Sequence, residues 1–143
     1  MIRVAFRPSA KGVRTGALTI TDNAPDSPQT VALTGTGTVV QLSPMIVNFG
    51  NQRVGTTSPP HTVTLTNTGD TPLSIRGIAV VGPNFGDFVE TTTCGSSVPA
   101  HSSCAIDVRF APAATGPRGA SIRVRDDGGG GTQDVNLRGT GIL

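Results

Sequence analysis

The stretch Ala105–Phe110 reads AIDVRF and alternates apolar with polar side chains. Ile106, Val108 and Phe110 point to one side of an extended chain, because successive side chains of a β-strand point to opposite faces. Three other stretches alternate in the same way: residues 62–66, 122–125 and 134–138. This period of two predicts strands of a sheet that is buried on one face only.

Further strands are predicted between turns rich in glycine, proline and asparagine, at residues 39–42, 45–49, 73–81 and 85–90. No window combines the 3.6-residue period of a helix with capping residues, so we expect almost no helix. Seven to eight short strands over residues 38–143 predict an all-β protein with an immunoglobulin-like β-sandwich.

The chain also contains an internal repeat of domain length. Residues 2–37 align with residues 106–141 at a constant offset and without a gap. The repeated positions include Ile2/Ile106, Val4/Val108, Phe6/Phe110, Pro8/Pro112, Gly12/Gly116, Arg14/Arg118, Asp22/Asp126, Gln29/Gln133, Val31/Val135, Leu33/Leu137 and the Gly-Thr-Gly triplets 35–37 and 139–141. The repeat predicts that residues 38–143 form a complete module, and that residues 1–37 are the C-terminal third of a preceding one.

Residues 1–37 are therefore predicted to form three strands that lack the rest of a sandwich. Apolar side chains on these strands would be left uncovered: Ile2, Val4, Phe6, Leu18, Ile20, Val31 and Leu33. Strands with a free edge and an uncovered face pair with another chain. One hypothesis is that they join copies of the protein into a dimer or filament. The alternative is that the chain is a piece of a longer tandem protein.

Three phrases carry a resemblance to a known family: VTLTNTG at residues 63–69, CAIDVRFAP at residues 104–112, and LRGTG at residues 137–141. They resemble the abnormal-spindle/Hydin type of immunoglobulin-like domain over residues 38–143, and residues 2–37 match its last strands. Bacterial members stand in tandem in large exported proteins, including choice-of-anchor D proteins. The resemblance implies a module that binds or builds, and it identifies no ligand.

Cys94 and Cys104 are the only cysteines in the chain. The glycine and serines between them allow the loop to close, so we expect a disulfide between the loop and the start of the Ile106–Phe110 strand. Two free thiols are the alternative. A disulfide favours an oxidising compartment, and hence an extracellular, cell-surface or periplasmic location.

Metal binding is a rival role for the cysteines, because His101 and His61 supply two more candidate ligands. The tight Cys-x2–4-Cys pair of zinc sites is absent from the sequence. Asp22, Asp26, Asp126 and Asp127 raise the question of calcium, but no loop has a spaced array of acidic residues. We therefore predict no metal and no cofactor.

The composition argues against several functions. The net charge is only +2 and there is no Trp or Tyr, so we do not expect binding of nucleic acid or carbohydrate. No apolar run is long enough to insert into a membrane, and Arg3 and Arg7 interrupt any signal-peptide core at the N-terminus. No catalytic motif is present, so we predict that the chain is not an enzyme.

Three functions remain open. The chain is expected to be a structural or adhesive module of an exported bacterial tandem-repeat surface protein, whose partners are neighbouring modules or other proteins. The second possibility is a self-assembling subunit that pairs strands through residues 1–37. The third is an intracellular scaffold domain.

Overall fold

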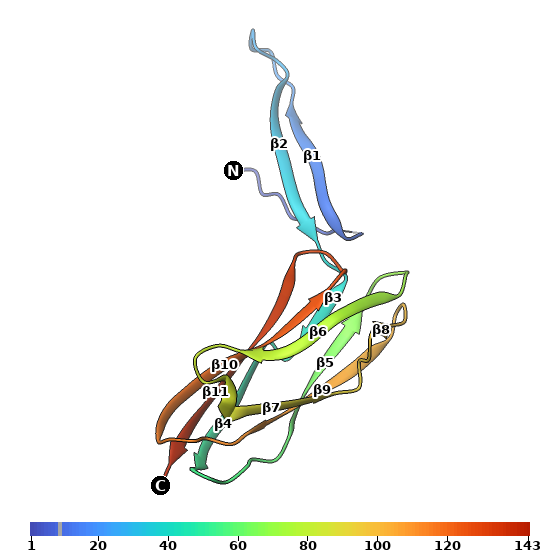
Figure 1. The fold of residues 1–143 in the computed structure, drawn as a ribbon. Helices are drawn as coiled ribbons and strands as arrows, with labels where there is room; N and C mark the ends of the chain where they lie inside the picture. The colour runs from blue at the N-terminus through green and yellow to red at the C-terminus, as the bar shows by residue number, and fades with distance from the viewer. Residues whose placement is uncertain (9) are drawn as a thin grey trace.

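The computed structural model describes residues 1–8 and 10–143, and Figure 1 shows a β-sandwich with a long hairpin extending from one end. One sheet has the strand order β4-β11-β10-β6-β8 and the other has the order β3-β5-β9-β7. The first contains β4 (Ile46–Arg53), β6 (Leu73–Val81), β8 (Ser97–Val98), β10 (Gly116–Asp126) and β11 (Thr132–Ile142). The second contains β3 (Val40–Ser43), β5 (His61–Asn67), β7 (Phe88–Thr92) and β9 (Ser103–Phe110). The predicted all-β, immunoglobulin-like sandwich is confirmed.

The core lies between the two sheets, where the predicted alternation places it. Ile106, Val108 and Phe110 of β9 are completely buried, while the intervening polar side chains face outward. The buried apolar residues of the other strands include Val63, Leu65, Leu73, Ile122, Val124, Val135 and Leu137. One continuous core therefore holds residues 40–142 together.

A buried asparagine explains the phrase VTLTNTG. Asn67 is completely buried at the end of β5, and its side-chain amide donates hydrogen bonds to the carbonyls of Thr71, Val98 and Pro99. Its side-chain oxygen accepts the N–H of Gly69 at 3.0 Å. A buried polar group is tolerated only when it is hydrogen-bonded, and here Asn67 joins two segments, residues 69–71 and 98–99, at one end of the sandwich.

Two local details differ from the prediction. Residues 85–90 were expected to form a strand, but Phe85–Asp87 form a 3-10 turn, η1, and β7 begins only at Phe88. The two-residue strand β8, paired with β6, was not predicted. Two residues cannot display a period of two, so the pattern held no signal for β8.

The N-terminal part forms a separate two-stranded antiparallel sheet of β1 (Gly12–Ile20) and β2 (Gln29–Gly37). The prediction of three strands is wrong here, because Ile2, Val4 and Phe6 lie outside any strand. The equivalent segment of the sandwich, residues 106–110, is a strand because it pairs with both β5 and β7. Among the described residues, residues 2–6 have no such partner strands.

Candidate interaction surface

The hairpin β1–β2 reproduces the hairpin β10–β11 of the sandwich. In the first, Gly12 pairs with Gly37 and Leu18 with Val31. In the second, Gly116 pairs with Gly141 and Ile122 with Val135, which is the same register after the repeat offset. Because the register fixes which side chains share a face, one face of β1–β2 carries the residues that form core in the sandwich. We call Phe6, Arg14, Gly16, Leu18, Ile20, Val31, Leu33 and Gly35 the hairpin face.

The hairpin face lacks the cover that the sandwich provides. Phe6 is 52% exposed whereas its equivalent Phe110 is completely buried, and Val31 is 50% exposed whereas Val135 is completely buried. Among the other predicted assembly residues, Leu18 and Leu33 are half-buried, and the rest are exposed: Ile2, Val4 and Ile20. The same residue types at the same register positions thus differ mainly in what lies over them.

The phenylalanine of each repeat lies over a glycine of the last strand. A Cβ atom on Gly139 would come within 2.5 Å of the Phe110 ring, and one on Gly35 would come within 2.8 Å of the Phe6 ring. Only a residue without a side chain allows this approach. The Phe6 ring therefore lies on the hairpin face as the Phe110 ring lies on β10–β11.

A groove of about 500 Å³ opens between residues 4–6 and the hairpin. Its walls are mainly apolar, and the polar side chains that line it are those of Arg14, Thr15 and Thr34. The complete list of lining residues is Val4, Ala5, Phe6, Arg14, Thr15, Gly16, Ala32, Leu33, Thr34 and Gly35.

The sandwich shows what occupies the equivalent space. The Arg118 side chain donates from Nε to the Asp87 carboxylate, which is buried and also accepts the N–H of Ala113. Asn84 exchanges hydrogen bonds with the backbone of Gly119, at 2.8 Å and 3.1 Å. The Phe88 ring stacks on Phe110 with a centroid distance of 4.8 Å. The segment from Asn84 to Phe88 therefore seals this end of the core.

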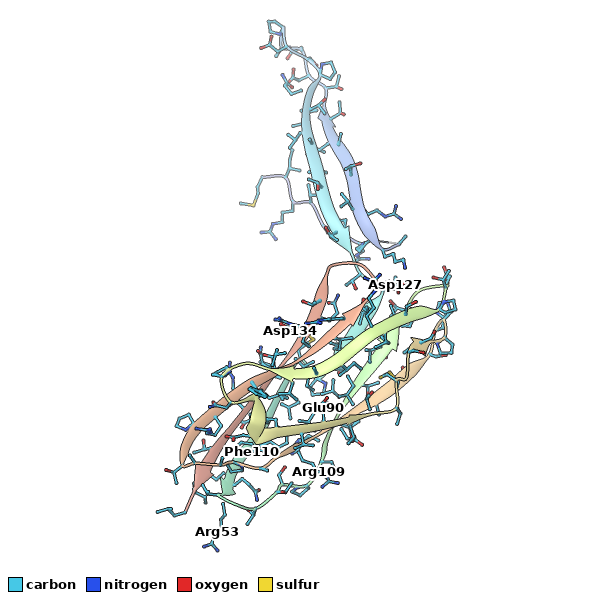
Figure 2. All side chains as sticks on the ribbon, in the orientation of Figure 1. Arg53, Glu90, Arg109, Phe110, Asp127 and Asp134 are labelled. Carbon is cyan, nitrogen blue, oxygen red and sulfur yellow. A yellow bond between two sulfur atoms is a disulfide. The ribbon has the colours of Figure 1, made fainter. Side chains whose placement is uncertain are left out.

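The hairpin joins the sandwich through a close contact. Gly37 is followed by Thr38 and Val39, and the N–H of Val39 donates to the carbonyl of Gly128 at 2.9 Å. The Lys11 ammonium donates to the carbonyl of Asp127 at 2.8 Å and lies 3.7 Å from its carboxylate. Figure 2 shows Asp127 at the end of the sandwich that faces the hairpin.

A glycine in the β10–β11 turn makes this contact possible. Gly129 has a φ of +88°, and a Cβ atom there would come within 2.4 Å of the Gly37 carbonyl oxygen and 3.0 Å of the Lys11 side chain. Gly131 in the same turn has a φ of +81°, but a Cβ atom there would have no other atom within 4 Å. Both glycines are favoured by backbone conformation, and Gly129 is required in addition by the junction.

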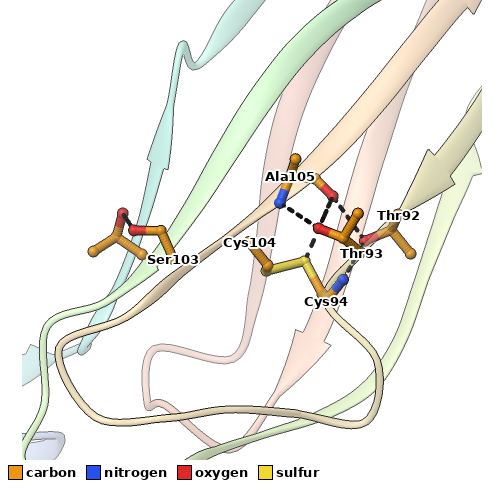
Figure 3. Close-up of a disulfide and its surroundings, with 7 residues drawn as sticks. Thr92, Thr93, Cys94, Ser103, Cys104 and Ala105 are labelled. Carbon is orange, nitrogen blue, oxygen red and sulfur yellow. Dashed lines mark hydrogen bonds between the residues drawn. A yellow bond between two sulfur atoms is a disulfide. The ribbon is translucent and has the colours of Figure 1, made fainter.

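Cys94 and Cys104 form a disulfide with a Cα–Cα distance of 4.9 Å (Figure 3). Cys104 lies in β9, and Cys94 follows β7. The enclosed loop carries β8 across to the other sheet, where Val98 pairs with Leu73. Around the bridge, the N–H of Cys94 donates to the Thr92 hydroxyl and the N–H of Ala105 donates to the Thr93 hydroxyl, each at 3.0 Å. The bridge thus joins the end of β7 to β9 within one sheet and closes the loop that carries β8 to the other sheet.

The remaining candidate ligands are dispersed. His101 pairs with Asp70 at 2.7 Å on the surface, and the His61 ring packs on Phe49. Asp22 and Asp126 each accept a backbone N–H two residues later, from Ala24 and Gly128. Within residues 1–8 and 10–143, no three His, Cys, Asp or Glu side chains gather in a way that would hold a metal ion.

The pKa values of two neighbouring carboxyls at the junction, Asp126 and Asp127, are shifted in opposite directions. Burial raises the pKa of Asp126 above its ordinary value, and the charge of Asp127 adds to the effect. Hydrogen bonding from the Ser74 N–H lowers the pKa of Asp127, which therefore stays ionised beside Lys11.

The sequence profile of the abnormal spindle-like microcephaly-associated, ASPM-SPD-2-Hydin (ASH) domain matches residues 38–133. The chain belongs to the ASH family. ASH domains are PapD-like modules of protein–protein interaction and are non-catalytic. The resemblance in the three sequence phrases is thus confirmed as a family relationship.

Several solved structures resemble the fold of this sandwich. PapD-like domain 7 of human CEP192 is 20% identical with a TM-score of 0.55, and the match covers 73% of this chain and 86% of that one. The VesB protease of Vibrio cholerae is 15% identical with a TM-score of 0.54, over 73% of this chain and 32% of that one. The secreted serine protease VesC of Vibrio cholerae is 17% identical with a TM-score of 0.51, over 66% and 21%. At these identities the likeness is one of fold alone.

No curated protein sequence matches the chain. In the part of the ASH chain that the structure describes, no helix has the length and apolarity needed to cross a bilayer.

Sequence reasoning missed the ion pair between Arg118 and Asp87 and the contact between Lys11 and Asp127. One signal for the first was present, because Arg14 and Arg118 recur at the repeat offset among mainly apolar and glycine positions. An arginine repeated within a core pattern indicates a buried partner of opposite charge. Nothing in the sequence pointed to the second.

Proposed function

We propose that the chain is a non-catalytic structural or adhesive module of an exported bacterial protein built from tandem ASH sandwiches. The observation that carries this proposal is the identical register and phenylalanine–glycine packing of β1–β2 and β10–β11. On this proposal, residues 1–37 are the C-terminal third of a preceding module and residues 38–143 are a complete one. The matching register supports a chain in which the same unit is repeated.

The junction supports a mechanical role. Only Thr38 and Val39 separate the end of β2 from the start of β3, and Val39 is itself hydrogen-bonded to the Gly128 carbonyl. The contact of Gly129 with Gly37 and Lys11 leaves little freedom for bending. Consecutive modules joined in this way would form a semi-rigid rod that spaces or presents other domains.

The disulfide supports export. Structural disulfides persist in oxidising compartments and are rare in the cytosol, so the bridge Cys94–Cys104 favours an extracellular, cell-surface or periplasmic location. The competing function, an intracellular scaffold domain, predicts that both cysteines are reduced in native material. Mass spectrometry of alkylated, unreduced protein from its own cell distinguishes the two.

The junction is tested by measuring residual dipolar couplings of the full chain and of two glycine variants. A rigid junction gives one alignment tensor for β1–β2 and for the sandwich. Gly129→Ala should separate the two tensors, because the added methyl group collides with the Gly37 carbonyl. Gly131→Ala is the matched control, because it carries the same positive-φ strain without a collision. Two different tensors in the unmodified chain would refute the semi-rigid rod.

Self-assembly through residues 1–37 is a second candidate, favoured by the exposed apolar side chains of the hairpin face. Light scattering of the intact chain and of a version starting at Val39 tests it. A dimer or polymer that disappears with residues 1–38 would establish assembly. Two monomers at high concentration would leave the spacer function.

A further inference from the structure

The groove on the hairpin face has an internal template, because the sandwich contains the same site with its occupant in place. In the sandwich, three side chains of one short segment make the closing contacts: Asn84, Asp87 and Phe88. Their partners are the Gly119 backbone, Arg118 and Phe110. The repeat offset converts these partners into Thr15, Arg14 and Phe6, and all three line the groove.

We propose that the groove is a binding site for a protein segment with the pattern Asn-x-x-Asp-Phe, in which a turn leads into a strand that begins at the phenylalanine, as in residues 84–92 of the sandwich. The occupant's aspartate would pair with Arg14, its phenylalanine would stack on Phe6, and its asparagine would bond the backbone of Thr15. The inference rests on the proposed function, because residues 1–37 would carry part of an ASH sandwich, and the remaining part of that sandwich would be a natural source of such a segment.

Charge supports an acidic occupant. Among the described residues, Arg14 is exposed and has no ion-pair partner, whereas Arg118 is half-buried against a buried carboxylate. The first 37 residues contain four cationic side chains, all before residue 15, and two carboxylates, Asp22 and Asp26, between β1 and β2; the cationic residues are Arg3, Arg7, Lys11 and Arg14. Face-to-face pairing of two hairpins would bring like charges together, while an aspartate would neutralise the arginine on an apolar floor.

Backbone geometry supports an occupant that is extended from its phenylalanine onward. In the sandwich, β7 pairs antiparallel with β9, with Phe88 opposite Phe110 and Thr92 opposite Ile106. Residues 2–6 are the equivalent of β9 and lie outside any strand, so their backbone groups are available to a partner strand. An occupant in the β7 position would add a strand opposite Ile2–Phe6 while placing its aspartate on Arg14. Main-chain pairing would supply affinity, and the two side-chain contacts would supply specificity.

The test is an NMR titration of the isotopically labelled full chain with a synthetic peptide of residues 82–92, GPNFGDFVETT. We expect chemical-shift changes confined to residues 2–6, 14–16 and 33–35, at peptide concentrations up to roughly 1 mM, because a short peptide loses much of its gross binding energy to ordering. Asp87→Asn and Phe88→Ala in the peptide should each weaken binding about tenfold or more.

Three protein variants test the charge contact. Arg14→Gln should weaken binding about tenfold, whereas Arg7→Gln removes the same charge outside the groove and should change it less than about threefold. A chain with Arg14→Glu should bind a peptide with Asp87→Lys better than the unmodified peptide. This charge exchange would show a direct contact, which a general loss of positive charge cannot reproduce.

Several results would overturn the proposal. These are no shift changes up to roughly 1 mM peptide, equal binding by Arg14→Gln and unmodified chains, or changes located beside β9 and β10, where residues 82–92 lie in the sandwich. A homodimer that buries the groove and resists the peptide would assign the face to a second copy. Amide hydrogen exchange distinguishes failure of the groove proposal from failure of the proposed function. Protected β1–β2 amides without peptide binding reject the groove alone, and an unprotected hairpin rejects the partial module itself.

Discussion

The repeat offers a paired core substitution in one chain, Phe110→Ala and Phe6→Ala. Phe110 is completely buried, and its ring centroid lies 4.8 Å from that of Phe88 and 5.7 Å from that of Phe49. Removing a fully buried phenylalanine costs about 3–5 kcal/mol. We expect about 4 kcal/mol for Phe110→Ala, because the glycine beneath the ring has no side chain with which to fill the cavity.

Phe6→Ala should leave the main unfolding transition within about 0.5 kcal/mol of the unmodified chain. The Phe6 ring is half exposed, lies against Gly35 of the hairpin and is not part of the sandwich core. The chain has no Trp or Tyr, and urea unfolding is therefore followed by far-ultraviolet circular dichroism with the disulfide intact. Equal destabilisation by the two variants would refute the reasoning, because it would mean that Phe6 is as covered in solution as Phe110.

Three further predictions concern the sandwich. The double variant Cys94→Ser and Cys104→Ser should lose about 2–3 kcal/mol of unfolding free energy, from closure of a loop of this length, and a loss below about 1 kcal/mol in urea melts would contradict it. Gly139→Ala should cost about 2–3 kcal/mol in the same assay, because its Cβ collides with the phenylalanine ring of β9, whereas Gly119→Ala, whose nearest atom lies at 3.8 Å, serves as the milder control. A hydrogen bond from Arg123 in β10 lowers the pKa of Asp134 in the folded chain. The contribution of this carboxylate to stability is therefore complete above the unfolded pKa of about 3.9, and it disappears as the pH falls through the lower folded pKa. Thermal melts of an Asp134→Asn variant should therefore converge with those of the unmodified chain as the pH falls below about 4, and a constant difference would disprove the assignment.

The sequence predicted the sandwich well where its signal is periodic. The inward residues of β9, predicted from alternation, are all buried. Strand β6, predicted from the turns that flank it, is observed at the predicted bounds, residues 73–81. The prediction was poorer where structure depends on contacts between distant segments. The 3-10 turn at residues 85–87 is fastened to β10 by Asn84 and Asp87, which no local pattern could reveal.

The candidate site shows the same division. The apolar assembly residues were identified from the repeat, and each has the residue type of its buried counterpart or a closely similar one. The groove was not predicted, because it exists only where Phe6 folds back onto Gly35 and lies near Arg14. A segment without alternating partners gives no sequence signal for where it will lie.

By itself, the sequence determined the class of fold, the inward face of each long strand, the repeated unit and the pairing available to two cysteines. These properties follow from side-chain period and from order along the chain, which are local. Only the tertiary structure decided that residues 2–6 form no strand, that Arg118 has a buried carboxylate and Arg14 has none among the described residues, and that Gly129 lies against Gly37. The physical reason is that strand pairing, charge burial and close backbone approach each need a second segment, whose position the fold alone supplies.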